Sequence, residues 1–137
     1  MTSVLLSQHD LFIISASQDR SIKIFDLAYK RLVFHYNDIH EGIISSIAIS
    51  ADASLLVSGS QDKSIKMFDF KTKQQIYHFK DNTDGENLYN FLVHWISTLD
   101  VIFSVAVSPD NHLIASGSED KSLQIYDIHT NELIYQF

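Results

Sequence analysis

The sequence predicts an all-β protein built as a β-propeller, and three observations lead to that fold class. A twelve-residue phrase occurs three times, as SASQDRSIKIFD at 15–26, SGSQDKSIKMFD at 58–69 and SGSEDKSLQIYD at 116–127. The copies lie 43 and 58 residues apart, and a period near 43 is typical of stacked supersecondary units. Around them are runs of five to seven residues rich in Ile, Val, Phe and Tyr, separated by polar turns, as in antiparallel β structure.

Each phrase belongs to a unit of four short strands, called a to d in chain order. In the second unit these strands are expected at 44–50, 55–59, 64–69 and 75–79. The other two units match at the offsets of 43 and 58 residues. We therefore expect one partial propeller domain over 1–137, with blade one at 3–36, blade two at 44–79 and blade three at 102–137.

The inner strands indicate that the units pack face to face. LFIIS at 11–15 and LLVS at 55–58 are apolar at nearly every position, whereas a sheet with one wet face would alternate. Small sheets that are buried on both faces and repeat at a fixed period pack radially as propeller blades.

The three phrases, with an H-x-G motif at 40–42 before the second, resemble the WD-repeat (β-transducin repeat) propeller family. The resemblance implies a structural tetrad: a His before strand a, a Ser on strand b, an Asp in the b–c turn and a Trp on strand c. The matching positions are Ser15, Asp19 and Phe25 in blade one; His40, Ser58, Asp62 and Phe68 in blade two; and Ser116, Asp120 and Tyr126 in blade three.

This chain departs from the family pattern at two tetrad positions. Every tetrad Trp is Phe or Tyr, so only Tyr126 keeps a polar group there, and the His position of blade three holds Thr98. We therefore expect apolar packing to hold the blades together more than the hydrogen bonds of the tetrad do. The Ser, His and Asp residues are interpreted as structural, because a catalytic triad occurs once and this set repeats.

The composition predicts a soluble protein that is not an enzyme. Of its 137 residues 45% are hydrophobic and 20% charged, with no apolar run near the ~20 residues of a membrane span and no secretory leader. The absence of Cys fits a reducing compartment, so we expect a cytoplasmic location, with the nucleus left open. A net charge of −7 argues against direct nucleic-acid binding. The seven His show no metal-ligand spacing and the four Gly form no phosphate loop, so neither a metal nor a cofactor is expected.

Three blades are few for a closed ring, since propellers close with four to eight. Three possibilities follow: the chain is part of a longer propeller, two copies join into a six-bladed ring, or partner blades complete the ring.

The longer spacing before the third phrase predicts a helical insertion at 81–100. Apolar residues at 88, 91, 92, 95, 96 and 99 follow helical spacing, and Thr83 with Glu86 forms a capping box. This helix either packs on the rim of the propeller or docks a partner, in which case His94 and Trp95 are its candidate contacts.

The expected partners are other proteins. By the family resemblance, the b–c turns share a face with the insertion, so Arg20, Lys63 and Lys121 would surround the central channel. Such cations either are simply solvated or receive an acidic or phosphorylated peptide. The predicted function is a non-catalytic scaffold that assembles proteins; the alternative is a substrate or phosphopeptide receptor subunit of a ubiquitin-ligase or other regulatory complex.

Overall fold

Twelve β-strands form the described part of the computed structural model, which covers residues 1–7, 11–80 and 101–137. Blade one consists of β1 (Ser3–Leu6), β2 (Phe12–Ala16), β3 (Ile22–Asp26) and β4 (Arg31–Tyr36). Blade two consists of β5 (Ile44–Ile49), β6 (Leu55–Ser60), β7 (Ser64–Asp69) and β8 (Gln75–Lys80). Blade three consists of β9 (Ile102–Val107), β10 (Leu113–Ser118), β11 (Leu123–Asp127) and β12 (Leu133–Gln136).

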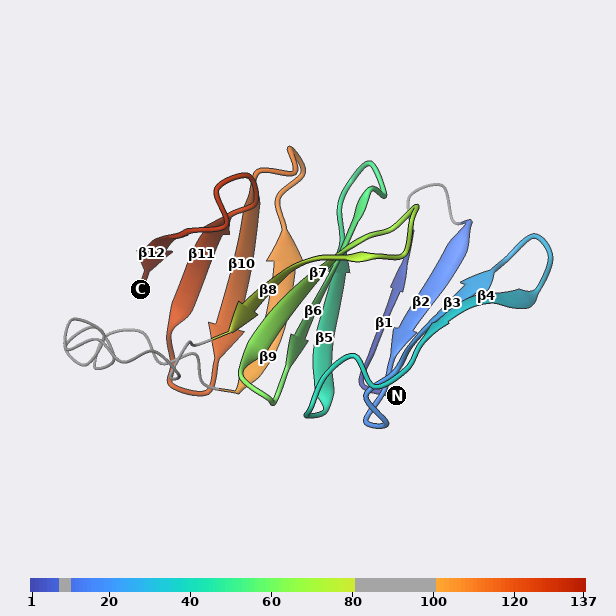
Figure 1. Ribbon diagram of the computed structural model, residues 1–137, viewed down its shortest axis with the longest axis horizontal. Helices are drawn as coiled ribbons and strands as arrows, with labels where there is room; N and C mark the ends of the chain where they lie inside the picture. The colour runs from blue at the N-terminus through green and yellow to red at the C-terminus, as the bar shows by residue number, and fades with distance from the viewer. Residues whose placement is uncertain (8–10, 81–100) are drawn as a thin grey trace.

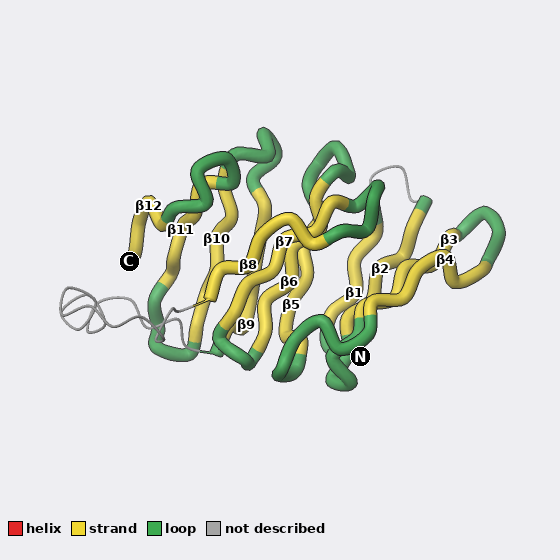
Figure 2. The backbone as a smooth tube through the Cα atoms, in the orientation of Figure 1, coloured by secondary structure: helices red, strands yellow, loops and turns green. Residues whose placement is uncertain are grey.

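Each blade is a separate antiparallel sheet in which strands follow one another in chain order. The three sheets stand side by side as an open fan, with blade one at one end and blade three at the other (Figure 1). Figure 2 shows only strands and loops in the described ranges, and no helix lies in them. The predicted all-β propeller with an incomplete ring is confirmed, whereas the predicted helix at 81–100 lies outside the described residues.

The same irregularity recurs on strand c of every blade. The register with strand d shifts between Ile24 and Phe25, between Met67 and Phe68, and between Ile125 and Tyr126. These are equivalent positions in the repeated phrase. A bulge bends a strand and increases its twist, so the three blades acquire the same local shape beside the aromatic residue of the phrase.

The core consists of two interfaces between blades. We call the face of a blade that is turned toward the next blade in the chain its leading face, and the opposite face its trailing face. At the first interface the buried residues are Ile14, Ala16, Ile22, Ile24 and Tyr36 of blade one and Ile44, Ile47, Leu56, Phe68 and Phe70 of blade two. At the second they are Val57, Ile65, Met67 and Phe79 of blade two and Ile102, Val105, Ile114, Tyr126 and Ile128 of blade three.

The two interfaces repeat each other position by position. The ring of Tyr36 lies 4.9 Å from that of Phe68, and the equivalent rings of Phe79 and Tyr126 lie 4.7 Å apart. A hydroxyl also links the inner strands at each interface: Thr2 donates to the carbonyl of Ile44, and its counterpart Ser45 to that of Ile102. Equivalent residues therefore form both interfaces between blades in the same way.

Candidate protein-interaction site

The b–c turns form one edge of the fan, the lower edge in Figure 1, where the segment between β4 and β5 also lies. Each turn is organised by the Asp of the repeated phrase. Asp62 Oδ1 accepts hydrogen bonds from the Ser64 amide at 3.0 Å and hydroxyl at 2.6 Å, and Asp19 holds Ser21 in the same way. In blade three Asp120 Oδ1 accepts the Ser122 amide at 2.8 Å. A short carboxylate that bonds its own backbone two residues on is a strong determinant of turns.

A basic residue follows each of these aspartates in the left-handed backbone region. The φ angles of Arg20, Lys63 and Lys121 are 67°, 68° and 71°, and all three residues are exposed. Their amides donate to the carbonyls of Ser17, Ser60 and Ser118, three residues earlier. Residues with a side chain are uncommon in this region, so the three equal angles reflect a turn that the surrounding hydrogen bonds enforce.

In blade two a buried histidine connects the loop before strand a to the sheet. His40 Nδ1 lies 2.9 Å from Asp62 Oδ2, and Nε2 lies 2.8 Å from Ser58 Oγ. A carboxylate only accepts hydrogen bonds, so Nδ1 carries a proton that it donates to Asp62, and Nε2 and the Ser58 hydroxyl share a second hydrogen bond. The Ser64 hydroxyl also lies 3.0 Å from Nδ1, although Ser64 is not one of the tetrad positions. We call these four residues the polar relay.

Burial and hydrogen bonding act in opposite directions on Asp62. Burial raises the pKa of its carboxyl, but the hydrogen bonds from His40 and Ser64 and the amide of Glu41 outweigh it and hold that pKa well below the usual range. The loop also comes very close to the turn at Gly42, where an added Cβ would lie 2.7 Å from the amide nitrogen of Asp62. Both ends of the H-x-G motif thus have a structural role. The ring of His40 bonds the b–c turn, and Gly42 leaves room for the backbone of that turn.

The tetrad aromatic residues lie apart from the polar relay. Phe68 is buried in the interface between blades one and two, where it contacts Tyr36, and its strand neighbour across β6 is Leu56 rather than Ser58. Phe25, its counterpart in blade one, is half-buried.

Blade three lacks the relay among the described residues. The hydroxyl of Tyr126 donates to Gln124 Oε1 at 2.5 Å and does not bond Ser116. Ser116 is buried and its hydroxyl has no hydrogen-bond partner in the described part of the chain. The predicted set of Ser116, Asp120 and Tyr126 is therefore not joined by hydrogen bonds. In blade one, Ser15 is half-buried on β2, while the hydrogen bonds of Asp19 to described residues all lie within its own turn.

The predicted partner contacts differ in their surroundings. Arg20 forms an ion pair of 2.6 Å with Asp38 in the segment between β4 and β5, and both side chains are well exposed. Lys63 and Lys121 are exposed at the matching turns of the other blades. His94 and Trp95 lie outside the described residues.

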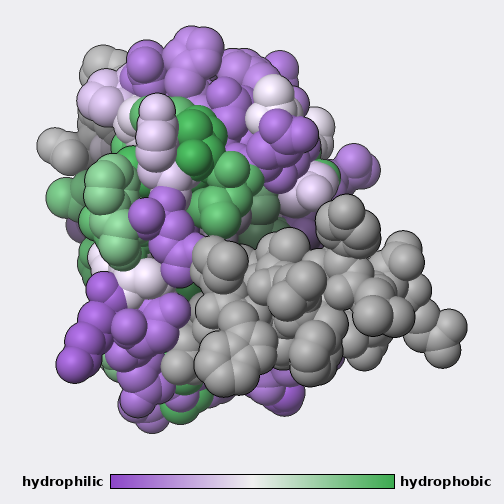
Figure 3. Space-filling model, turned by 90° about the vertical axis from the view of Figure 1, so that its left-hand side faces the viewer, coloured by the Kyte–Doolittle hydropathy of each residue, from purple (hydrophilic) through white to green (hydrophobic). Residues whose placement is uncertain are grey.

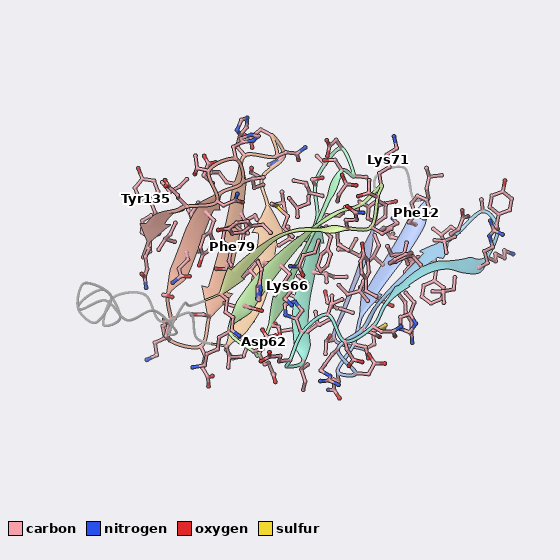
Figure 4. The ribbon with its side chains drawn as sticks, viewed as in Figure 1. Phe12, Asp62, Lys66, Lys71, Phe79 and Tyr135 are labelled. Carbon is pink, nitrogen blue, oxygen red and sulfur yellow. The ribbon has the colours of Figure 1, made fainter. Side chains whose placement is uncertain are left out.

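A small pocket beside the polar relay was not foreseen from the sequence. Its lining residues are Glu41, Asp62, Ser64, Lys66, His78 and Lys80. Lys66 and His78 face each other across β7 and β8, and Figure 4 shows Lys66 near Asp62. Burial, followed by the charge of Lys66, lowers the pKa of His78. Strand alternation predicts that these side chains share a face, but only the fold brings Glu41 to them.

The repeated phrase is recognised in comparisons with known families. A family model described as "WD domain, G-beta repeat" matches residues 1–26, 32–69 and 85–127, which together are most of the chain. The chain belongs to the WD-repeat family. Each matched segment ends on strand c of one blade and contains one copy of the repeated phrase, so all three copies lie in WD repeats.

Solved structures of WD-repeat proteins share the fold of this chain. Two of them, "Crystal structure of RRP9 WD40 repeats" and "Structure of U3-55K", each match with a TM-score of 0.83 at 21% sequence identity. Each match covers 99% of this chain and 38% of the other chain. The chain thus spans well under half the length of these structural relatives. No curated protein sequence matches it significantly.

Within 1–7, 11–80 and 101–137, no group of three or more His, Cys, Asp or Glu side chains is arranged to hold a metal ion. The same ranges include no helix with the length and apolar character needed to cross a membrane.

Proposed function

We propose that this protein is a non-catalytic interaction scaffold, and that it binds other proteins at the edge formed by its b–c turns. The observation that supports the proposal most strongly is the burial of the polar relay. Ser58, His40 and Asp62 have the hydrogen-bond order of a hydrolytic triad, yet Ser58 is fully buried and His40 is 2% exposed. A substrate carbonyl cannot reach a hydroxyl that is enclosed in this way, so the set serves to hold the turn.

The same turns offer contacts to a partner. Three cationic side chains stand exposed at equivalent places, on a chain whose net charge is −7. Rim charges of this kind steer association and choose partners more than they add affinity. We propose acidic protein surfaces as the partners, without nucleic acid, and the cytoplasm as the location.

A receptor for phosphorylated peptides in a ubiquitin-ligase or other regulatory complex is the less favoured function. Such a receptor needs arginine for bidentate phosphate contacts. Arg20 is the sole arginine among the three turn cations, and its guanidinium already pairs with Asp38. A phosphate would have to displace that carboxylate.

The scaffold proposal is tested by capturing partners with the immobilised chain and identifying them by mass spectrometry. Changing Lys63 and Lys121 together to Glu is expected to remove the captured proteins, with the melting temperature preserved. Lys71→Glu is the matched control, because Lys71 is exposed on the opposite edge of the same fan (Figure 4). The proposed face is wrong if Lys71→Glu removes the captured proteins as fully as the double variant does, or if the double variant still captures them.

Catalysis is tested separately with a fluorophosphonate probe, which labels activated serines. We expect no labelling of the folded chain. Labelling that disappears in Ser58→Ala would show that the buried hydroxyl is reactive and would overturn the non-catalytic proposal.

A further inference from the structure

The trailing face of blade two carries a group of cationic and polar side chains beside the polar relay. Lys66 on β7 faces His78 on β8, and Ser64 faces Lys80 two residues along the same strands. Ile65, which lies between Ser64 and Lys66 on β7, belongs to the opposite, leading face. Strand alternation therefore places the four polar side chains on one face of the sheet.

This combination is specific to blade two. Blade three has Gln124 and Gln136, which carry no charge, at the positions of the Lys–His pair. Blade one keeps that pair but has Asn37 in place of the second lysine. The end of the molecule that blade three forms instead presents a gathering of hydrophobic side chains (Figure 3). The cationic group is thus a feature of one blade and not of the repeat.

The four side chains line the small pocket described above, together with Glu41 and Asp62. Lys66 Nζ donates a hydrogen bond to the carbonyl of Ile39, which ties the segment between β4 and β5 to the sheet beside the pocket. The cavity has a volume of about 20 Å³, and roughly 10–15 Å³ is needed to hold one water-sized group. It therefore has room for about one oxygen atom of a ligand.

The pocket offers hydrogen-bond donors that the described residues leave without acceptors. Nε2 of His78 is buried and has no hydrogen-bond partner in the described part of the chain. The ammonium group of Lys66 has three N–H donors, and the carbonyl of Ile39 takes one of them. A neutral imidazole can carry its proton on Nε2, so both side chains can donate to one acceptor placed between them.

The acceptor groups at the pocket do not match these donors. Asp62 Oδ1 accepts the amide and the hydroxyl of Ser64, and Oδ2 lies 2.9 Å from His40 Nδ1 and 2.8 Å from the amide of Glu41. A carboxylate accepts about four hydrogen bonds, so Asp62 is saturated. The side chain of Glu41 is exposed. Since a water molecule donates as well as accepts, a ligand that only accepts fits this lining better.

The charges around His78 also favour an anion. Burial is the largest cause that lowers the pKa of His78, followed by the charge of Lys66 on β7. Asp62 in the b–c turn raises that pKa, while His40 in the preceding loop and Lys80 on β8 lower it. An anion bound in the pocket would raise the pKa, because an opposite charge nearby favours the imidazolium form.

We propose that this pocket binds one carboxylate through Lys66, His78 and Lys80, and that an Asp or Glu side chain of a partner protein supplies it. Charge-assisted hydrogen bonds of this kind are about twice as strong as neutral ones. Through Asp62 and Ser64 the pocket adjoins the b–c turn, on the edge assigned to partners, and its volume suits the tip of a side chain. The choice of a protein as the source rests on the proposed scaffold function; the carboxylate site itself does not.

The carboxylate site is tested by adding acetate to the full chain at constant ionic strength while NMR follows the ring signals of its histidines. The signals of His78 should shift to saturation, and the apparent pKa of His78 should rise in saturating acetate. Acetamide has the same shape without the charge and should have no effect. The internal control is His35, which faces Lys23 in the same register in blade one but is exposed. Absence of a saturable shift at His78, an equal shift at His35, or an equal response to acetamide would overturn the proposal.

Substitutions at two exposed residues determine the sign of the charge that the pocket prefers. Lys80→Gln should weaken acetate binding about two- to fivefold, as for an exposed ion pair, and Glu41→Gln should strengthen it by removing a like charge. Lys71→Gln on the opposite edge is the control and should leave binding unchanged (Figure 4). All three side chains are exposed, so the melting temperature should stay that of the unaltered chain. Stronger binding after Lys80→Gln, or weaker binding after Glu41→Gln, would contradict an anion site.

A pair of blocked tripeptides tests the protein source of the carboxylate. Gly-Glu-Gly should shift the His78 signals as acetate does, and Gly-Gln-Gly should not. A response to acetate without a response to the glutamate peptide would assign the pocket to small free carboxylates and overturn the protein source. Partner capture with the double variant of Lys63 and Lys121 is measured separately, so a failure of the scaffold proposal and a failure of this pocket are distinguishable.

Discussion

At the scale of single residues, Asp62 does more than its counterparts Asp19 and Asp120. All three accept hydrogen bonds from the Ser two residues later, but only Asp62 also bonds His40 and the amide of Glu41 in the described structure. One carboxylate thus joins a local turn to a segment 22 residues away.

Asp62→Ala should lower the free energy of unfolding by roughly 1–3 kcal/mol, because it leaves buried donors without an acceptor. Urea denaturation measures this loss. Lys63→Ala is the neighbouring control and should change stability by no more than about 0.5 kcal/mol, as is usual for an exposed side chain. Equal stabilities for Asp62→Ala and the unaltered chain would show that the carboxylate is not structural.

The same carboxylate makes stability depend on pH in a defined direction. Its folded pKa is held below the unfolded value of ~3.9, so its contribution is complete above that pH and is lost as pH falls toward the folded pKa. The stability difference between the unaltered chain and Asp62→Asn should therefore be constant above pH ~5 and shrink below pH ~4. Urea titrations at several pH values measure it; a difference that grows on acidification would reverse the sign assigned here.

At the scale of elements, the loop between β4 and β5 is positioned by close contact as well as by hydrogen bonds. Gly42 touches the backbone of the b–c turn, and the amide of Gln61 donates to the carbonyl of Ile43 at 2.9 Å. The amide of Glu119 donates to the carbonyl of Val101 in the same way in blade three. This pairing places the loop and the turn of a blade on one edge.

Gly42→Ala should destabilise the chain by roughly 1–3 kcal/mol, because the new Cβ would meet backbone atoms of the turn that cannot rotate away. Thermal denaturation measures the change. Gly117→Ala is the control at a glycine with open space, and it should leave the dilute monomer unaffected. Similar losses at both glycines would point to a general cost of side chains rather than to the close approach at Gly42.

At the scale of the whole molecule, stability comes from apolar contact between blades, and within the described residues this contact occurs at the two interfaces between neighbouring blades. Ile65 and Leu123 occupy the same position in successive blades, yet Ile65 is fully buried and Leu123 is exposed. Ring contacts such as that between Phe79 and Tyr126 exist where a neighbouring blade is present.

Ile65→Ala should reduce the free energy of unfolding by about 2–5 kcal/mol, because it opens a cavity between blades two and three. Leu123→Ala should change it by about 0.5 kcal/mol or less in the dilute monomer, where that side chain already contacts water. Denaturation at low protein concentration compares them. A large loss from Leu123→Ala under these conditions would mean that the end face is already covered.

The sequence by itself determined the features that depend on residues close together in the chain. The repeated phrase predicted the strands, the b–c turns and the three-blade fan, because strand alternation and turn chemistry act over a few residues. The family resemblance also grouped His40, Ser58 and Asp62, which the structure joins by hydrogen bonds.

Only the tertiary structure decided how the surroundings of equivalent positions differ from one blade to the next. Phe68 packs against Tyr36 and is not part of the polar relay, whereas Ser64 is. The Tyr126 hydroxyl donates to Gln124. Arg20 forms an ion pair with Asp38. Gly59 and Gly117 stand in the same SGS tripeptide, but one glycine is filled by the next blade and the other faces open space. The physical reason is that burial and close contact depend on which blade lies alongside, and a repeated local pattern is the same in every copy.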